Sequence, residues 1–159
     1  MPTPIWIDPI YDRTQADVDR VKELKDIGYF NMTNTEKAEW ATDLKGALNQ
    51  SDLIRIETDI HILSDVLELS LTTYEDNMPE IPDQTYYKHL RDCITAIRDA
   101  GYVKSTTPTT PNSPLNAYKK INDIEEILFD VYTILNSTFY YWCMSPAEIY
   151  AGESTGLLL

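Results

Sequence analysis

The sequence predicts an all-α fold: a helical bundle of about five helices, two of them long, with an extended N-terminal arm and a short irregular or β C-terminal tail. Two segments, 53–71 and 115–136, alternate apolar residues three and four positions apart, which is the heptad spacing of helices that pack on helices. Residues typical of N-caps precede several shorter amphipathic segments. A pattern of apolar, any, basic and apolar residue also opens three of the expected helices, at 18–21, 53–56 and 118–121.

The composition is that of an acidic globular protein. A chain of 159 residues with 43% hydrophobic and 25% charged residues is typical of one folded domain. The net charge of −13 repels phosphate backbones and anionic lipid, so we expect no nucleic-acid and no membrane partner. No window approaches the roughly 20 apolar residues that span a bilayer, and no signal peptide is visible.

The first residues predict an arm followed by a capped helix. Residues 1–13 hold three prolines with interleaved aromatic residues, so we expect an extended segment in which Trp6 and Tyr11 are candidate anchors. Thr14 is placed as an N-cap and Gly28 as the end of this first helix.

A second helix is predicted from the capping box that Thr33 and Glu36 can form. One side of this helix would carry Trp40, Leu44, Ala47 and Leu48. Asn49 and Ser51 then offer the cap of the third helix, with Asp52 placed favourably in its first turn.

The segment 53–71 gives the strongest helix prediction of the chain. Its seam consists of Leu53, Ile56, Ile60, Leu63 and Leu67. Further apolar residues widen this face: Ile54, Ile62, Val66 and Leu69. We therefore expect other parts of the protein to cover the helix on more than one side.

Two more helices and a tail are expected in the C-terminal half. A helix over 84–100 is followed by a proline-rich connector, 104–114, and by the long helix over 115–136, where Ser113 and Pro114 would supply the cap and the first turn. The helical bundle domain thus spans 14–137. The aromatic tail, 138–159, contains Pro146 and Gly152, which favour a short strand or irregular structure.

No motif predicts an enzyme, a cofactor or a metal site. His89 and Cys93 could share a helix face, but two ligands do not make a zinc site. His61 and Ser64 lack an orienting carboxylate and an oxyanion hole. The many carboxylates of the long helices, among them Glu57, Asp59, Asp65, Glu125, Glu126 and Asp130, are interpreted as solvated faces.

Aromatic residues are the candidate interaction residues, because they bury large areas at interfaces. The candidates are Trp6, Tyr11, Phe139, Tyr140, Tyr141, Trp142 and Tyr150. For the aromatic tail the alternative is that it closes the bottom of the chain's own helical core.

Four stretches together resemble phage and prophage proteins of gut Firmicutes, described as virion or tail-associated structural proteins. These stretches are 11–21, 32–49, 52–57 and 147–153. The resemblance implies a non-enzymatic structural or adaptor role at a tail tip, baseplate or fibre attachment, in a virion assembled from proteins made in the bacterial cytoplasm. It implies other phage structural proteins as partners, and a homo-oligomer, with a trimer expected because tail appendages are often threefold.

Two other functions are open. The negative charge fits a phage-encoded inhibitor of a host nucleic-acid-binding protein, which would need its carboxylates aligned on one face. The aromatic tail fits a hydrolase acting on host surface glycan, which would need a carboxylate pair that the sequence does not place.

Overall fold

The protein is all-helical over the residues that the structure describes, which confirms the predicted class. A computed structural model gives the backbone of residues 5–156 and the side chains of residues 5–137. In this part of the chain the elements are five α-helices and one 3-10 turn: α1 (Gln15–Ile27), η1 (Tyr29–Asn31), α2 (Asn34–Trp40), α3 (Gln50–Val66), α4 (Gln84–Ala100) and α5 (Tyr118–Gly156).

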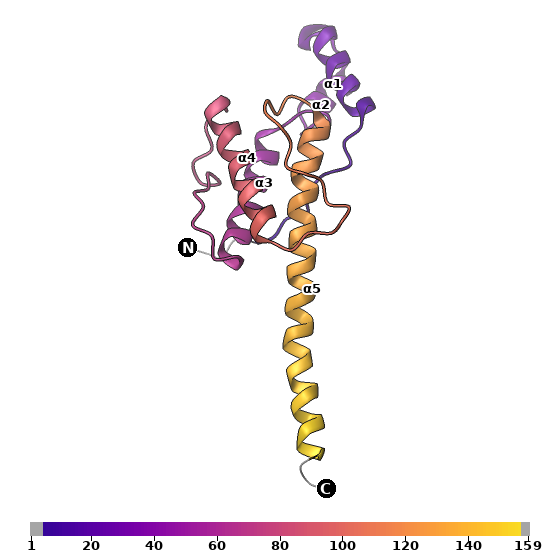
Figure 1. The fold of residues 1–159 in the computed structure, drawn as a ribbon. Coiled ribbons are helices and arrows are strands. Elements are labelled where there is room, and N and C mark those ends of the chain that lie inside the picture. The colour runs from indigo at the N-terminus through magenta and orange to yellow at the C-terminus, as the bar shows by residue number, and fades with distance from the viewer. Residues whose placement is uncertain (1–4, 157–159) are drawn as a thin grey trace.

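The helices α3, α4 and the first half of α5 pack on one another and enclose the core (Figure 1). The largest fully buried apolar side chains come from these helices and from α1: Leu24, Ile56, Ile60, Leu63, Leu90, Ile94, Ile97, Ile124, Ile127 and Leu128. Burial of each such side chain stabilises the fold by about 1.5–3 kcal/mol before entropy is counted. The helices α1 and α2 lie at the end of the bundle where α5 begins, and α5 runs on past the opposite end.

The predicted starts of the first four helices are confirmed, the third with Asn49 and not Ser51 as its cap. The Thr14 hydroxyl accepts from the third residue of α1, and Thr33 does the same for α2, each within a complete capping box. The backbone N–H of Asn49 donates to Asp52 over 2.9 Å at the start of α3. Gly28 ends α1 with φ 74°, a left-handed value that glycine adopts without strain.

The helix α2 is shorter than the sequence predicts. It ends at Trp40, with Ala41 as its C-cap, and the chain then turns through residues 41–49. The Thr42 hydroxyl donates to the Glu39 carbonyl over 2.7 Å, which satisfies a backbone group at the helix end. Leu44, Ala47 and Leu48 therefore lie in the segment after the helix. The prediction that they line one side of the helix is wrong.

The helix α3 stops at Val66, five residues before the predicted end. Glu68 adopts φ 54°, the Leu69 N–H donates to the Ser64 carbonyl over 2.8 Å, and the Glu68 N–H donates to the Asp65 carbonyl. This pair of hydrogen bonds is a Schellman motif. Glutamate at the left-handed position hides the stop from the sequence, because glycine is the usual signal there.

The predictions for both ends of the last helix are wrong. It begins at Tyr118, so Ser113 and Pro114 lie in the connector and do not open the helix. It continues through Gly156, where a short irregular or β tail was predicted. The run 138–144 is apolar at nearly every position, so it shows no period that separates strand from helix.

Gly46 determines how closely α1 approaches the turn before α3. A Cβ at position 46 would overlap the backbone carbonyl of Asp17 and lie 2.6 Å from the Val18 nitrogen. We expect Gly46→Ala to lower the free energy of unfolding by about 3 kcal/mol, because backbone atoms cannot move aside as a side chain can. Urea denaturation measures this change in the free energy of unfolding. The matched control is Gly28→Ala, which meets no atom within 4 Å and should lose only about 1 kcal/mol to its positive φ. Equal losses would contradict the close approach of α1.

Candidate interaction surface

The N-terminal arm, residues 5–13, lies against α5 through its aromatic side chains. The rings of Trp6 and Tyr132 stack with centroids 3.7 Å apart and planes 5° apart. Tyr11 contacts Phe129 with ring centroids 5.3 Å apart. The structure therefore places two of the candidate interaction residues, Trp6 and Tyr11, on their own chain.

Hydrogen bonds to buried groups of α3 and α5 fix the backbone of the arm. The Ile10 N–H donates to Glu125 over 2.6 Å, and the Ile7 N–H lies 3.5 Å from Asp59. The Asn122 amide donates to the Arg13 carbonyl over 2.9 Å. Because the arm is extended, these long-range bonds take the place of helical bonds for its backbone.

A buried network of four charges joins the arm to the bundle. Arg13 contacts Asp52 at 3.0 Å and Glu125 at 2.7 Å, and Arg55 contacts the same two carboxylates at 2.8 Å and 2.9 Å. Each of the four side chains is at most 10% exposed. Two arginines and two carboxylates balance in charge, which makes burial of the group tolerable. Burial alone would lower the pKa of Arg55, but Glu125 and Asp52 raise it.

The basic residue of the recurring helix-start pattern has a definite role in each copy. Arg20 of α1 contacts Glu39 of α2 at 2.6 Å, and Arg55 of α3 contacts Glu125 of α5. The Lys120 ammonium of α5 donates to the carbonyls of Asn112 and Pro114 in the connector. The pattern thus marks places where the first turns of a helix are tied to another segment.

Several carboxylates that the sequence analysis interprets as solvated are buried instead. They are Glu57, Asp59, Glu125 and Asp130. Asp130 accepts from Lys104 and from the Thr107 hydroxyl at 2.6 Å each, which ties the connector to α5. Burial raises the pKa of Glu57 and raises that of Asp59 to about 7.

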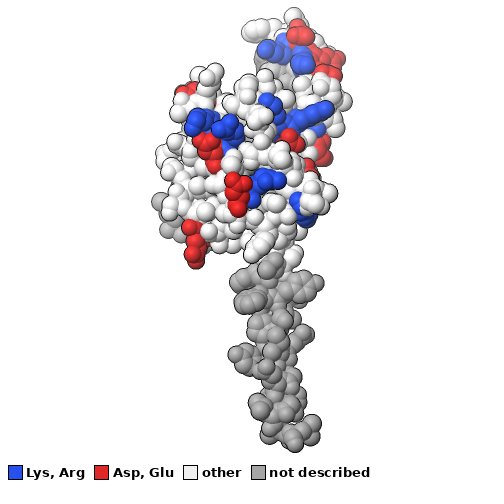
Figure 2. Space-filling model, in the orientation of Figure 1, with Lys and Arg blue, Asp and Glu red and all other residues white. Residues whose placement is uncertain are grey.

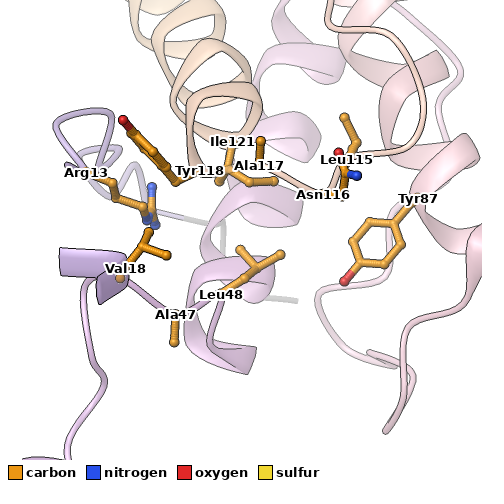
Figure 3. Close-up of a pocket in the computed structure, with 11 residues that line it drawn as sticks. Arg13, Val18, Ala47, Leu48, Tyr87, Leu115, Asn116, Ala117, Tyr118 and Ile121 are labelled. Atoms are coloured by element: carbon orange, nitrogen blue, oxygen red, sulfur yellow. The ribbon is translucent and has the colours of Figure 1, made fainter. Parts of the chain in front are cut away.

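An open hollow of about 310 Å³ lies where α1, the turn before α3, the end of the connector and the start of α5 meet (Figure 3). Arg13, Val18 and Ala47 line one side, Tyr87 and Leu115 line the other, and Leu48 lies between them. Both terminal nitrogens of Arg13 already bind carboxylates. The hollow is a junction between segments with a mixed polar and apolar lining, and the charge of its one lining arginine is already balanced by carboxylates.

A second hollow, of about 300 Å³, lies at the place where α5 leaves the bundle. Its lining is almost wholly apolar: Ile62, Leu63, Val66, Tyr132, Leu135 and Asn136. We call these six residues the root groove. Val66 is 59% exposed here. The predicted covering of α3 on several sides thus holds for its seam from Leu53 to Leu63, but it fails at Ile54 and at the last turn of the helix.

Beyond the root groove α5 continues as a rod past the other helices (Figure 1). Its 39 residues correspond to a length of roughly 58 Å. Between Asp130 and Glu148 the sequence has no charged residue. Five candidate interaction residues belong to this part of α5, outside the residues whose side chains the structure describes: Phe139, Tyr140, Tyr141, Trp142 and Tyr150.

The residues considered for chemistry make contacts within the fold. The Cys93 sulfur lies 3.5 Å from His89 Nε2, so the two do share a helix face, but burial raises the pKa of Cys93 to about 11 and favours the thiol. The Ser64 hydroxyl donates to the Leu69 carbonyl over 2.7 Å, and His61 contacts Glu75. Among the described residues, no group of three or more His, Cys, Asp or Glu could hold a metal ion.

The surface charges are mixed on the face shown in Figure 2, where acidic and basic residues alternate over the bundle. None of the helices searched in the described residues has the length and apolar character to cross a membrane. Comparison with family models, with curated proteins and with solved structures gives no match.

Proposed function

We propose that this protein is a non-enzymatic structural or adaptor component of a phage particle, at the tail, the baseplate or a fibre attachment. It acts through helix–helix contacts with further copies and with other phage structural proteins. The observation that carries the proposal is α5, a long helix that leaves the bundle with an uncharged, aromatic sequence. Such a helix is stable when other protein covers it. The resemblance to virion and tail-associated proteins supports a location in the phage particle.

The proposal that the protein is part of the phage particle is tested on purified particles. Peptides of this protein should appear in mass spectra of density-purified particles, at a ratio to the major tail protein that stays constant between preparations. A phage-encoded enzyme of the cytoplasm serves as the control that should be lost on purification. Recovery of this protein only in the soluble lysate would contradict the proposal.

We also expect a homo-oligomer, with a trimer as the first expected state. Light scattering on the full chain should give about three times the protomer mass of 18.3 kDa. The acidic protomers repel one another, so added salt is expected to favour the oligomer. A monomer at every concentration and salt level would contradict this part.

The net charge of −13 supports a second candidate, an inhibitor that offers carboxylates to a host nucleic-acid-binding protein. Its test is inhibition of a purified host nucleic-acid enzyme that the protein captures from lysate. The mixed charges of the visible face in Figure 2 give this candidate less support than the helical interaction proposal.

A further inference from the structure

The segment that leads from the end of α3 to the start of α4 contains no helix or strand (Figure 1). We call its residues, 67–83, the strap. Several of its apolar side chains pack against the core of the bundle: Leu67, Leu69, Leu71, Tyr74 and Met78. The strap therefore covers part of the core, and its remaining contacts decide how firmly this part stays covered.

The middle of the strap lies against α4. The Thr72 carbonyl accepts from the Cys93 thiol over 3.9 Å. The Tyr74 ring meets Tyr86 and His89 edge to face, with ring centroids 5.9 Å and 4.9 Å apart. These contacts are weak hydrogen bonds and ring contacts, so they hold the strap only in combination with its polar attachments.

The second half of the strap is packed loosely. An open hollow of about 360 Å³ lies between this half and α4, with Asn77 and Pro79 on one side and Tyr86 and His89 on the other. Ile81, which also lines the hollow, is 83% exposed. The strap thus has room to move away from α4 without displacing other parts of the protein.

Two ionisable side chains of α3 attach the middle of the strap to the bundle. The Tyr74 N–H donates to Glu57 over 3.0 Å, and the Glu75 carboxylate contacts His61. Glu57 and His61 stand four residues apart on α3, so they lie one above the other on the same face of the helix. Both attachments therefore depend on groups that can gain or lose a proton.

The attachment at Glu57 favours an uncharged carboxyl group. Glu57 is fully buried, and its Oε1 atom has no hydrogen-bond partner among the described residues. Burial raises the pKa of Glu57, and Glu75 of the strap raises it further. The Tyr74 N–H, together with Tyr86 and His89 of α4, acts in the opposite direction without cancelling this rise. A charge on Glu57 would therefore be destabilising under the closed strap.

The attachment at His61 requires a charged imidazole, because only the protonated ring forms an ion pair with Glu75. Asp65, 3.5 Å from His61 Nε2, favours the same charge. Burial alone would raise the pKa of Glu75, but Thr73, the backbone and His61 lower it, so Glu75 is the charged partner. Its side chain is only 16% exposed, and loss of the proton from His61 would leave it without its cation.

We propose that the strap is a proton-controlled cover, closed while Glu57 is uncharged and His61 is charged, and opened by the release of both protons. Opening uncovers Tyr86, His89 and Cys93 of α4, so that an aromatic surface becomes available to other protein at higher pH. Because the closed form binds more protons than the open form, the open fraction must rise with pH. This cover goes beyond the proposed function and does not depend on it.

Hydrogen exchange at the Tyr74 amide tests the cover, because this amide is bonded to Glu57 only in the closed form. Exchange of the full chain, corrected for the intrinsic rate at each pH, gives the opening equilibrium. Each released proton changes that equilibrium by up to about tenfold per pH unit, so protection of Tyr74 should fall at least about tenfold from about pH 5.5 to about pH 8.5. The lower limit lies above the ordinary pKa of glutamate, which keeps Glu75 charged.

The amide of Ile94, in the buried part of α4, is the internal control. It exchanges only when the core opens, so its protection should stay well above that of Tyr74 at every pH. Equal protection at the two amides would mean that the strap opens only with the whole fold, and would overturn the cover.

Two substitutions should remove the pH dependence. Glu57→Gln keeps the acceptor for the Tyr74 N–H but cannot ionise, and His61→Lys keeps a positive charge beside Glu75 over this range. In the double variant, protection of Tyr74 should change by less than about threefold between the two pH values. The matched control is Glu80→Gln, exposed in the strap, which should behave as the natural protein. Thermal unfolding at about pH 5.5 shows that the variants fold.

The natural protein alone can overturn the proposal. Protection at Tyr74 that does not fall with rising pH would show that the strap does not respond to protons. A fall that persists unchanged in the double variant would show that groups other than Glu57 and His61 control it. Both results leave the proposed role in a phage particle standing.

Discussion

Replacing Glu125 by glutamine is expected to lower the free energy of unfolding by about 3–5 kcal/mol, the usual cost of breaking a buried ion pair. Glu125 is fully buried and accepts hydrogen bonds from Ile10, Arg13 and Arg55. Glutamine keeps the shape but turns one acceptor oxygen into an NH₂ group that faces these donors. Two arginines would then share the single carboxylate of Asp52.

The matched control for this prediction is Glu126→Gln. It removes the same charge from the next position of α5, which is only partly buried, and should change stability by less than about 0.5 kcal/mol. Urea denaturation of both variants at one fixed protein concentration gives the comparison. Hydrogen exchange at the Ile10 amide should rise in Glu125→Gln, since that amide loses its acceptor. A loss below about 1 kcal/mol with unchanged exchange at Ile10 would show that the network does not hold the arm.

Local signals predicted the helices well, because a cap or a seam depends on residues close in sequence. Thr14, Thr33 and Asn49 each act within one turn, and the structure confirms all three helix starts. The seam of α3 from Leu53 to Leu63 is buried as its spacing indicates.

The buried network escaped prediction because its members come from the arm, α3 and α5. Glu125 lies 112 residues from Arg13 and 70 from Arg55, and no short-range rule relates them. A signal was nevertheless present: Arg55 and Glu125 each stand directly beside a seam residue, Ile56 and Ile124. Charges of opposite sign that flank two seams are candidates for pairing across the bundle, whereas Asp65, on the outer side of α3, is exposed.

The C-terminal part of α5 shows that local signals can also predict the end of a helix too early. Pro146 and the aromatic run favoured a tail of another kind, yet a helix that is already nucleated extends at low cost for each added residue. A proline inside a helix removes one hydrogen bond, and contact with other protein can offset that loss.

The titration of Asp59 should contribute to the pH dependence of the free energy of unfolding. Its side chain is 1% exposed, and burial raises its pKa from 3.8 to about 7. Arg55 acts against this shift, while Glu125 and Asp8 add to it. In the unfolded chain Asp59 loses its proton near pH 4, but in the folded chain it keeps the proton until about pH 7. At Asp59 the folded state therefore binds more protons between these values, and the contribution of Asp59 to stability falls as pH rises through this window.

The difference of about three pKa units corresponds to roughly 4 kcal/mol, at about 1.36 kcal/mol per unit. Asp59→Asn removes this titration and keeps the acceptor for the Ile7 N–H. We expect the variant to be more stable than the natural protein by up to about 4 kcal/mol at pH 8 and nearly equal to it at pH 4. Denaturation curves at a series of pH values measure the difference, with Asp65→Asn, an exposed neighbour on α3, as the control. A stability difference that stays constant from pH 4 to pH 8 would mean that the pKa of Asp59 is the same in the folded and the unfolded protein, and would contradict the shift.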